Sequence, residues 1–207
     1  SLADDESLGN GDASGGSISD DGRYVTFFSI ATNLVTGDSN NVRDVFVRDR
    51  TLGSTERVSV DSLGTEANGE SVFPVISADG RFVAFESLAT NLVANDTNNT
   101  FDVFVHELST EVTTRVSVSS NSSQAPGTSQ RPAISADGRF VAFQSVSSLV
   151  SGDTNGVLDV FVRDQSGGTT TRMSVKTDGG QATGASFRAS ISADGRFVSF
   201  VCAVTLM

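Results

Sequence analysis

The stretch "ISADGRFVAF", which begins at Ile76, decides the fold because this chain of 207 residues repeats it. The same ten letters return at Ile134, "ISADGRFVSF" begins at Ile191, and a looser copy, "ISDDGRYVTF", begins at Ile18. The copies therefore start 58, 58 and 57 residues apart. A fixed period of this length is typical of repeat architectures such as solenoids and propellers.

Two further motifs keep the same period and the same order, each occurring once per repeat. The first is "DVFVRD" or "DVFVHE", which begins at Asp44, Asp102 and Asp159. The second is "TERVSV", "TTRVSV" or "TTRMSV", which begins at Thr55, Thr113 and Thr170. We therefore treat residues 1–207 as a single repeat region with units at about 14–71, 72–129 and 130–186 and a partial unit at 187–207.

Each unit is predicted to form four antiparallel strands. In the second unit the expected strands are Phe73–Ser77, Arg81–Ser87, Asp102–Glu107 and Thr113–Ser119. The first two strands are joined by a tight hairpin at Asp79-Gly80, where glycine supplies the positive φ that such a turn needs. A longer connection joins the second strand to the third, and a linker rich in Gly, Ser and Asn leads to the next unit.

The strand sequences indicate that both faces of each sheet are covered. "RFVAF" and "DVFVR" are nearly continuous apolar runs, whereas a sheet with one wet face shows alternation. A four-stranded sheet buried on both sides and repeated at a fixed period is typical of a propeller blade. The predicted fold is therefore an all-β propeller of four-stranded antiparallel blades, with about three and a half blades in this chain. A sandwich of two sheets is the main alternative, but it does not require so regular a period.

The unit "PVISADGRFVAFESLATNLV…DVFVRD…TTRVSV" resembles the TolB-type, WD40-like propeller repeat, and the resemblance covers essentially the whole chain. In that repeat, the first strand ends in Ser-x-Asp-Gly and an apolar second strand is followed by Ser. The resemblance implies the fold and leaves the function open, because the repeat occurs in periplasmic TolB, in peptidase propeller domains and in many secreted bacterial proteins. The longer second-to-third connection of this chain departs from the average repeat.

The number of strands predicts open ends. Propellers typically have 4–8 blades, so three and a half blades do not close a ring. An open blade presents an apolar face and an unpaired strand edge, both of which favour association. We therefore expect self-association through the open blade edges, or a further domain.

The charge limits the classes of partner. The formal net charge is -11, so a nucleic-acid backbone and an anionic membrane surface would both be repelled. No apolar run approaches the length of a membrane span, and no membrane insertion is expected. The charge makes a cation or a basic partner more plausible than an anionic one, but an acidic, well-solvated surface is the simpler explanation.

The second-to-third connection contains the one pattern with metal-ligand character, Asp-x-Asn-x-x-x-Asp. It occurs in all three complete units, as Asp38, Asn40 and Asp44, as Asp96, Asn98 and Asp102, and as Asp153, Asn155 and Asp159. Calcium takes six to eight oxygen ligands, and these side chains with a main-chain carbonyl supply part of such a set. The pattern resembles a shortened form of the calcium loops in integrin propellers. Calcium is the only cofactor that the sequence suggests.

A structural interpretation of the same residues also holds. Asp and Asn close turns through their own side chains, and an acid at the start of a strand can bond to backbone amides of the next blade. The sequence leaves both interpretations of these loops open.

No catalytic residue is predicted. His106 is the only histidine; it stands where the other units have arginine, and we expect it on the surface, without a nucleophile beside it. Arginines follow the hairpin glycines, as in Arg81 and Arg139, and we expect them to pair with acids such as Asp79 and Asp137 or to pack on a neighbouring blade. Cys202, the only cysteine, aligns with serines of the other units and is expected to be a small buried residue.

The sequence thus predicts a non-catalytic binding or scaffolding propeller with a protein or glycan ligand, in a periplasmic, cell-surface or secreted bacterial protein. One alternative is a calcium-binding structural or adhesive module that uses the Asp loops. Another is the propeller domain of a larger peptidase or glycosidase.

Overall fold

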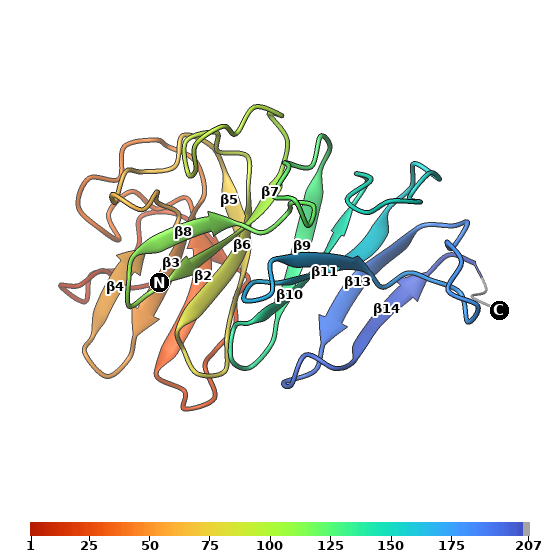
Figure 1. Cartoon of the computed structure of the whole chain (residues 1–207). Helices are drawn as coiled ribbons and strands as arrows, with labels where there is room; N and C mark the ends of the chain where they lie inside the picture. Colours follow the sequence, from red (N-terminus) through yellow and green to blue (C-terminus); the bar gives the residue numbers. More distant parts are fainter. Residues whose placement is uncertain (205–207) are drawn as a thin grey trace.

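The structure is a computed structural model that describes residues 1–204, and within that range the regular elements are all strands. Three sheets have four antiparallel strands each, and a fourth sheet has two (Figure 1). Blade 1 consists of β1 (Ala13–Ser14), β2 (Tyr24–Ser29), β3 (Asp44–Asp49) and β4 (Ser54–Arg57). Blade 2 consists of β5 (Ser71–Ile76), β6 (Phe82–Ser87), β7 (Asp102–Glu107) and β8 (Val112–Arg115). Blade 3 consists of β9 (Ser129–Ile134), β10 (Phe140–Ser145), β11 (Asp159–Asp164) and β12 (Thr169–Arg172). The terminal pair consists of β13 (Ser186–Ile191) and β14 (Val198–Cys202).

The sheets follow one another in sequence order around a common axis and do not close a ring (Figure 1). The first strand of each blade is innermost, since β5 contacts β9 and β9 contacts β13. It also packs on the second strand of the preceding blade, as β5 does on β2 and β9 does on β6. The predicted partial propeller of four-stranded antiparallel blades is confirmed.

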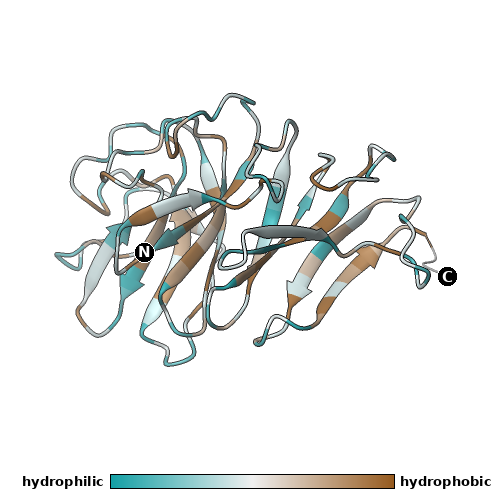
Figure 2. Ribbon diagram, viewed as in Figure 1, coloured by the Kyte–Doolittle hydropathy of each residue, from teal (hydrophilic) through white to brown (hydrophobic). Residues whose placement is uncertain are grey.

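The core lies between the blades, as the apolar strand runs predicted. Val103, Phe104 and Val105 on β7 alternate between the two faces of blade 2, yet each is at most 2% exposed. The Phe85 and Phe104 rings stack within blade 2, with their centroids 6.0 Å apart. They belong to one hydrophobic cluster with Val45 and Val47 of blade 1. Apolar residues accordingly follow the strands, whereas hydrophilic residues gather in the connections (Figure 2).

The hairpins between the first and second strands also join neighbouring blades. The predicted left-handed glycines are confirmed, with φ of +72° at Gly80 and +74° at Gly138. A Cβ placed on Gly138 would lie 2.1 Å from the Phe82 ring of blade 2, so glycine is needed for close approach as well as for φ. The amide of Asp79 also donates to the carbonyl of Ala136 in the next hairpin.

The strand bounds of blade 2 differ from the prediction by more than one residue at two points. The first strand begins at Ser71, and the fourth ends at Arg115 and not at Ser119. The chain leaves the blade edge after Arg115 because the Ser117 hydroxyl donates to the Asp102 carboxylate and accepts from the Val103 amide. Val118 then pairs with Gln124 in the linker to blade 3. None of the described residues forms a helix that could span a bilayer.

Candidate functional site

The loops that carry the Asp-x-Asn-x-x-x-Asp pattern lie against the inter-blade linkers. The side-chain amide of the central Asn donates to a linker carbonyl in every blade. In blade 1 this bond joins Asn40 to Ala67 at 3.0 Å, and in blade 2 it joins Asn98 to Ala125 at 2.9 Å. The loops and the linkers therefore share one face of the propeller.

The last acid of the pattern is a buried anchor at the start of the third strand. Asp44, Asp102 and Asp159 are each 0% exposed. Each accepts a hydrogen bond from a serine of the fourth-strand motif, namely Ser59, Ser117 and Ser174. These serine hydroxyls also accept from the following strand amides, at Val45, Val103 and Val160. The acid thus links the start of the third strand to the residues that follow the fourth strand.

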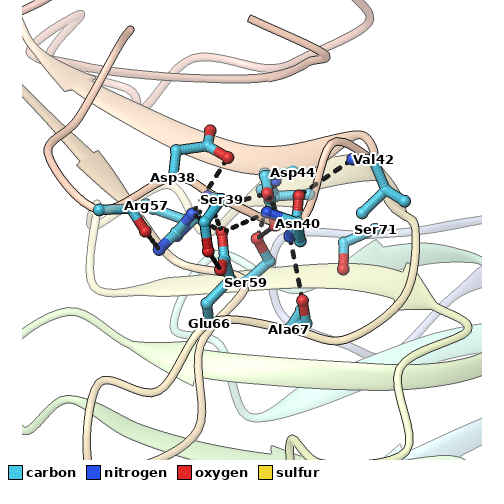
Figure 3. A network of polar contacts seen from close by, with 12 residues as sticks. Asp38, Ser39, Asn40, Val42, Asp44, Arg57, Ser59, Glu66, Ala67 and Ser71 are labelled. Carbon is cyan, nitrogen blue, oxygen red and sulfur yellow. Dashed lines mark hydrogen bonds and ion pairs between the residues drawn. The ribbon is translucent and has the colours of Figure 1, made fainter. Parts of the chain in front are cut away.

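An arginine lies among the carboxylates of each loop, and sequence reasoning missed it. In blade 1, Arg57 Nη1 lies 3.5 Å from Asp38, 3.7 Å from Asp44 and 2.6 Å from Glu66 (Figure 3). Arg115 lies near Asp96 and Asp102 in the same way, and Arg172 lies 3.5 Å from Asp153. The signal was present in the repeated "T-x-R-x-S-V" motif, whose arginine follows the strand threonine.

Burial dominates the electrostatics of these loops. Burial raises the pKa of Asp44 to about 6, against the hydrogen bonds from Ser59 and Asn40. The pKa values of Asp38, Asp102 and Asp153 are also raised, in each case first by burial. The arginine charge offsets part of this cost, because a buried carboxylate needs a compensating partner.

Blade 1 differs from the other two blades by one acid. Oxygens of Asp38, Asp44 and Glu66 all lie within 4.8 Å of one another. At the position of Glu66 the other linkers carry glutamine, and Gln124 and Gln181 donate to Asp96 and Asp153. A hydrogen bond joins the central Asn to the last Asp in blades 1 and 2, from Asn40 to Asp44 and from Asn98 to Asp102, and only blade 1 adds a third carboxylate. Calcium binding at these loops stays a prediction.

A second candidate site lies on the innermost strands. The register of the first strand against the second shifts in blades 2 and 3 and in the terminal pair, so that a bulge forms there. The bulged residue is left-handed in every unit, at Gly15, Phe73, Arg131 and Arg188, with φ between +52° and +57°. These four residues line a hollow of about 740 Å³.

The bulges are fixed from behind by side chains of the preceding blade. The amide of Arg131 donates to the Glu86 carboxylate at 2.6 Å, and the amide of Arg188 donates to Gln144 at 3.0 Å. Glu86 is only 1% exposed, and burial raises its pKa. The Arg131 guanidinium lies over the Phe73 ring, 3.7 Å from its centroid. The exposed arginines therefore face the hollow from backbone positions that are held rigidly.

Three expectations about single residues are corrected. His106 is not on the surface but fully buried at the junction of blades 1 and 2. The hairpin arginines do not pair with Asp79 and Asp137, which cap their own turns; Arg139, for example, pairs with Asp164 at the end of the third strand. Cys202 is half-buried because, within residues 1–204, no further blade covers β14.

No protein-family model matches the chain, and no curated protein matches it in sequence. Solved structures match over nearly its whole length. TolB from Acinetobacter baumannii is 17% identical with a TM-score of 0.56, over 92% of this chain and 38% of that one. The chain has a TolB-like propeller fold. The putative TolB from Agrobacterium tumefaciens is 20% identical with a TM-score of 0.55, over 94% of this chain and 59% of that one.

A protease propeller is also similar to this TolB-like fold. The β-propeller domain of the Trilobed protease from Pyrococcus furiosus, which has an open velcro topology, is 12% identical. The match has a TM-score of 0.53 and covers 88% of this chain and 47% of that one. The chain thus spans less than two thirds of each of these three structures. At these identities the likeness describes the fold alone.

Proposed function

We propose that this chain is a non-catalytic binding or scaffolding module of a secreted, periplasmic or surface-exposed bacterial protein. The location is supported by the likeness in fold to the TolB structures of two bacteria. The binding role is supported by the hollow on the innermost strands, which combines a rigid backbone with exposed side chains.

The observation that carries this proposal is the variation among the units at the bulge. The same backbone position holds glycine, phenylalanine, arginine and arginine in successive units, at Gly15, Phe73, Arg131 and Arg188. The residues that build the frame, such as the buried Asp at the start of the third strand, are identical in all three complete units. The side chain at the bulge varies among the units while the structural residues stay constant. The bulge side chain is therefore not needed for the fold and is available to contact a ligand.

The chemistry of the hollow favours a ligand with an anionic group. Arg131 and Arg188 are exposed there, although the chain as a whole carries a net charge of -11. Glu86 is 1% exposed and accepts from the Arg131 amide, so the side chains that solvent reaches at these two bulges are the arginines. Arginine binds carboxylates in a bidentate geometry, which suits an acidic sugar or a peptide carboxylate.

Arrays of acidic glycans and of carboxyl-terminated peptides, probed with the purified chain, test this function. We expect binding that the Arg131→Gln, Arg188→Gln double variant lowers by about tenfold or more, as for the loss of charge-assisted hydrogen bonds. The matched control is Arg196→Gln, which removes an exposed arginine from a hairpin and leaves the signal unchanged. Equal signal from the double variant and the wild type would contradict the proposal, as would a signal that depends on Asp153 and Asp159 instead.

A calcium-bound structural or adhesive module is the second candidate, and the three acids of blade 1 favour it. Asp38, Asp44 and Glu66 carry three negative charges against the single charge of Arg57. The matched variant is Glu66→Gln, because glutamine occupies this position in both other linkers. If calcium binds, millimolar calcium raises the melting temperature of the wild type through linkage, and Glu66→Gln abolishes the rise. If neither calcium nor chelator changes the melting temperature of the wild type, this candidate is ruled out.

The match to the Trilobed protease propeller supports a third candidate, the propeller domain of a larger hydrolase. In that case the chain alone is inert, and activity appears only when it is joined to a catalytic domain. An assay of the chain with peptide and glycoside substrates separates an active domain from this candidate and from the binding module.

A further inference from the structure

A cluster at the junction of blades 1 and 2 stands apart from both candidate sites. It consists of His106 on β7, Glu111 in the turn between β7 and β8, and Glu56 on β4 of the neighbouring blade. One ligand atom from each of the three lies within 4.8 Å of the others. His106 is 0% exposed, whereas both glutamates are exposed at a hollow of about 710 Å³. A buried imidazole therefore meets two carboxylates that solvent can reach.

The hydrogen bonds of blade 2 fix the tautomer of this histidine. The Thr113 hydroxyl donates to the carbonyl of Val60 at 2.6 Å, so its oxygen is left to accept from His106 Nδ1 at 2.9 Å. In the neutral ring the proton is thus on Nδ1, and Nε2 carries a lone pair. Nε2 is buried and has no hydrogen-bond partner. It lies 3.4 Å from Glu111 Oε2, and no hydrogen bond joins the two atoms.

A lone pair aimed at carboxylates is unfavourable unless a cation lies between them. No arginine or lysine within residues 1–204 forms an ion pair with Glu56 or Glu111, in contrast to the Asp loops with Arg57. His106 is 0% exposed, a setting that disfavours a charged ring without a partner. The cluster therefore lacks a compensating positive charge.

The three residues are also the places where this junction departs from the repeat. His106 aligns with Arg48 and Arg163, and Arg163 donates to the matching threonine and to a linker carbonyl. Glu56 aligns with threonine in the two other complete units, and Glu111 aligns with Gly53 and Gly168. All three turn residues are left-handed, with φ of +58° at Glu111, a conformation that glycine adopts without strain. Three departures that meet at one point indicate a shared role.

We propose that Glu56, His106 and Glu111 bind a divalent transition-metal ion of the zinc class. One imidazole nitrogen and two carboxylate oxygens suit such an ion, and three protein ligands leave a position open to water. Two ligands about 2.1 Å from a tetrahedral metal are about 3.4 Å apart, which is the separation of His106 Nε2 and Glu111 Oε2. The Thr113 hydroxyl orients the ring from behind, as outer partners of metal-bound histidines do. Because its ligands come from two blades, the ion clamps blade 1 to blade 2.

The single histidine makes the test direct. The metal-free chain is titrated with Zn²⁺ while the His106 ring signals are followed by NMR, and bound zinc is counted by equilibrium dialysis. We expect the ring signals to shift and the Nδ1-protonated form to persist in the complex. Glu111→Gly and Glu56→Thr restore residues that the sibling units carry, so both variants fold. Each is expected to weaken zinc binding by at least about 10- to 100-fold, the loss that follows when only an outer partner of a ligand is removed.

The matched control is Glu66→Gln, which alters the acid cluster around Arg57 and leaves the zinc-dependent shift of His106 intact. Co²⁺ supplies a second readout, since its absorption bands report a tetrahedral site with one nitrogen ligand. Ring signals that do not respond to Zn²⁺ would overturn the proposal and leave the cluster as a proton shared between two glutamates. An unchanged response in Glu111→Gly and Glu56→Thr would overturn it equally.

Discussion

Blade 2 and the terminal pair share the hairpin sequence "ISADGRFV", at 76–83 and 191–198, in very different surroundings. "FVAFES" forms β6 in blade 2, and "FVSFVC" spans Phe197–Cys202 at the terminal pair. In β6, Val83, Ala84 and Phe85 are 0% exposed, whereas at the equivalent positions Val198 and Phe200 are half-buried and Ser199 is exposed. An apolar strand sequence therefore makes burial possible, but the strand is buried only where a neighbouring blade packs on it.

The hairpins show how that neighbour acts. The turn of each blade lies on the aromatic ring that opens the second strand of the blade before it. Gly138 covers Phe82, and Gly195 covers Phe140, each at a distance that no side chain could share. Among the described residues no further hairpin lies on Phe197, and its ring is exposed. Contacts with the next blade therefore contribute to the stability of each blade.

Equivalent phenylalanines give the largest expected contrast. Phe85 and Phe200 occupy the same position of the repeat, but Phe85 is fully buried and Phe200 is half-buried. We expect Phe85→Ala to lower the free energy of unfolding by about 3–5 kcal/mol, and Phe200→Ala by about 1 kcal/mol. Urea denaturation followed by circular dichroism measures both values. Equal losses would break the comparison, because they would mean that the terminal pair is as well covered as blade 2.

Two left-handed glycines give the next contrast. Gly138 lies at a φ of +74° against the Phe82 ring, whereas Gly152 lies at +78° with no atom within 4 Å of the position that a Cβ would occupy. Gly152→Ala is expected to cost about 1 kcal/mol, from the backbone strain alone. Gly138→Ala is expected to cost about 3 kcal/mol, since the methyl group also displaces the ring. A similar cost at both positions would show that hairpin contact adds nothing to blade stability.

The open face predicts a concentration-dependent assembly. Phe197 and Val201 are exposed beside the unpaired edge of β14, which is a surface that favours association. We propose self-association through this edge, and expect Phe197→Ser to weaken it by about tenfold, or about 1.4 kcal/mol. Native mass spectrometry over a range of concentrations measures the effect. Leu63→Ser, at an exposed linker residue, is the control that leaves assembly unchanged.

The smallest contrast concerns the hairpin arginines. Arg139 pairs with Asp164 on the third strand at 2.8 Å, whereas Arg196 lies over the Phe197 ring and forms no ion pair within residues 1–204. The Arg139 hydrogen bond lowers the pKa of Asp164 to about 2. Because the folded-state pKa lies below the unfolded value, this stability is present above about pH 4 and is lost as the pH falls toward 2.

Arg139→Gln is therefore expected to lower stability only slightly at pH 7, because an exposed ion pair is screened by solvent. The loss disappears near pH 2, and Arg196→Gln has no measurable effect at either pH. Urea midpoints at pH 7 and at pH 2 provide the test. A loss for Arg139→Gln that stays constant with pH would show that the arginine acts by packing and not through Asp164.

The fold could be predicted because the same pattern of strands and turns recurs in each unit. The apolar runs at "RFVAF" and "DVFVR" indicated sheets buried on both faces, and the Asp-Gly pairs placed the hairpins. The ends of the fourth strands could not be predicted, because Val118 belongs to the linker hairpin only once Ser117 bonds to Asp102. That bond joins residues that the pattern of hydrophobicity does not relate.

The candidate sites were harder to predict than the fold. The Asp-x-Asn-x-x-x-Asp residues do meet, but the pattern gave no sign that Arg57 and its equivalents lie among them. The roles of His106 and Glu111 depend on a contact between two blades, which a single unit does not contain. Their signal was nevertheless in the sequence, as departures from an otherwise constant repeat.

Hydrogen exchange tests the central claim, that each blade depends on neighbours covering both of its faces. It is measured by mass spectrometry at a dilution where native mass shows a single chain. The account predicts that amides of β6 and β7 exchange at least roughly 100-fold more slowly than those of β13 and β14, despite the shared sequence. Equal protection of the two regions would contradict it.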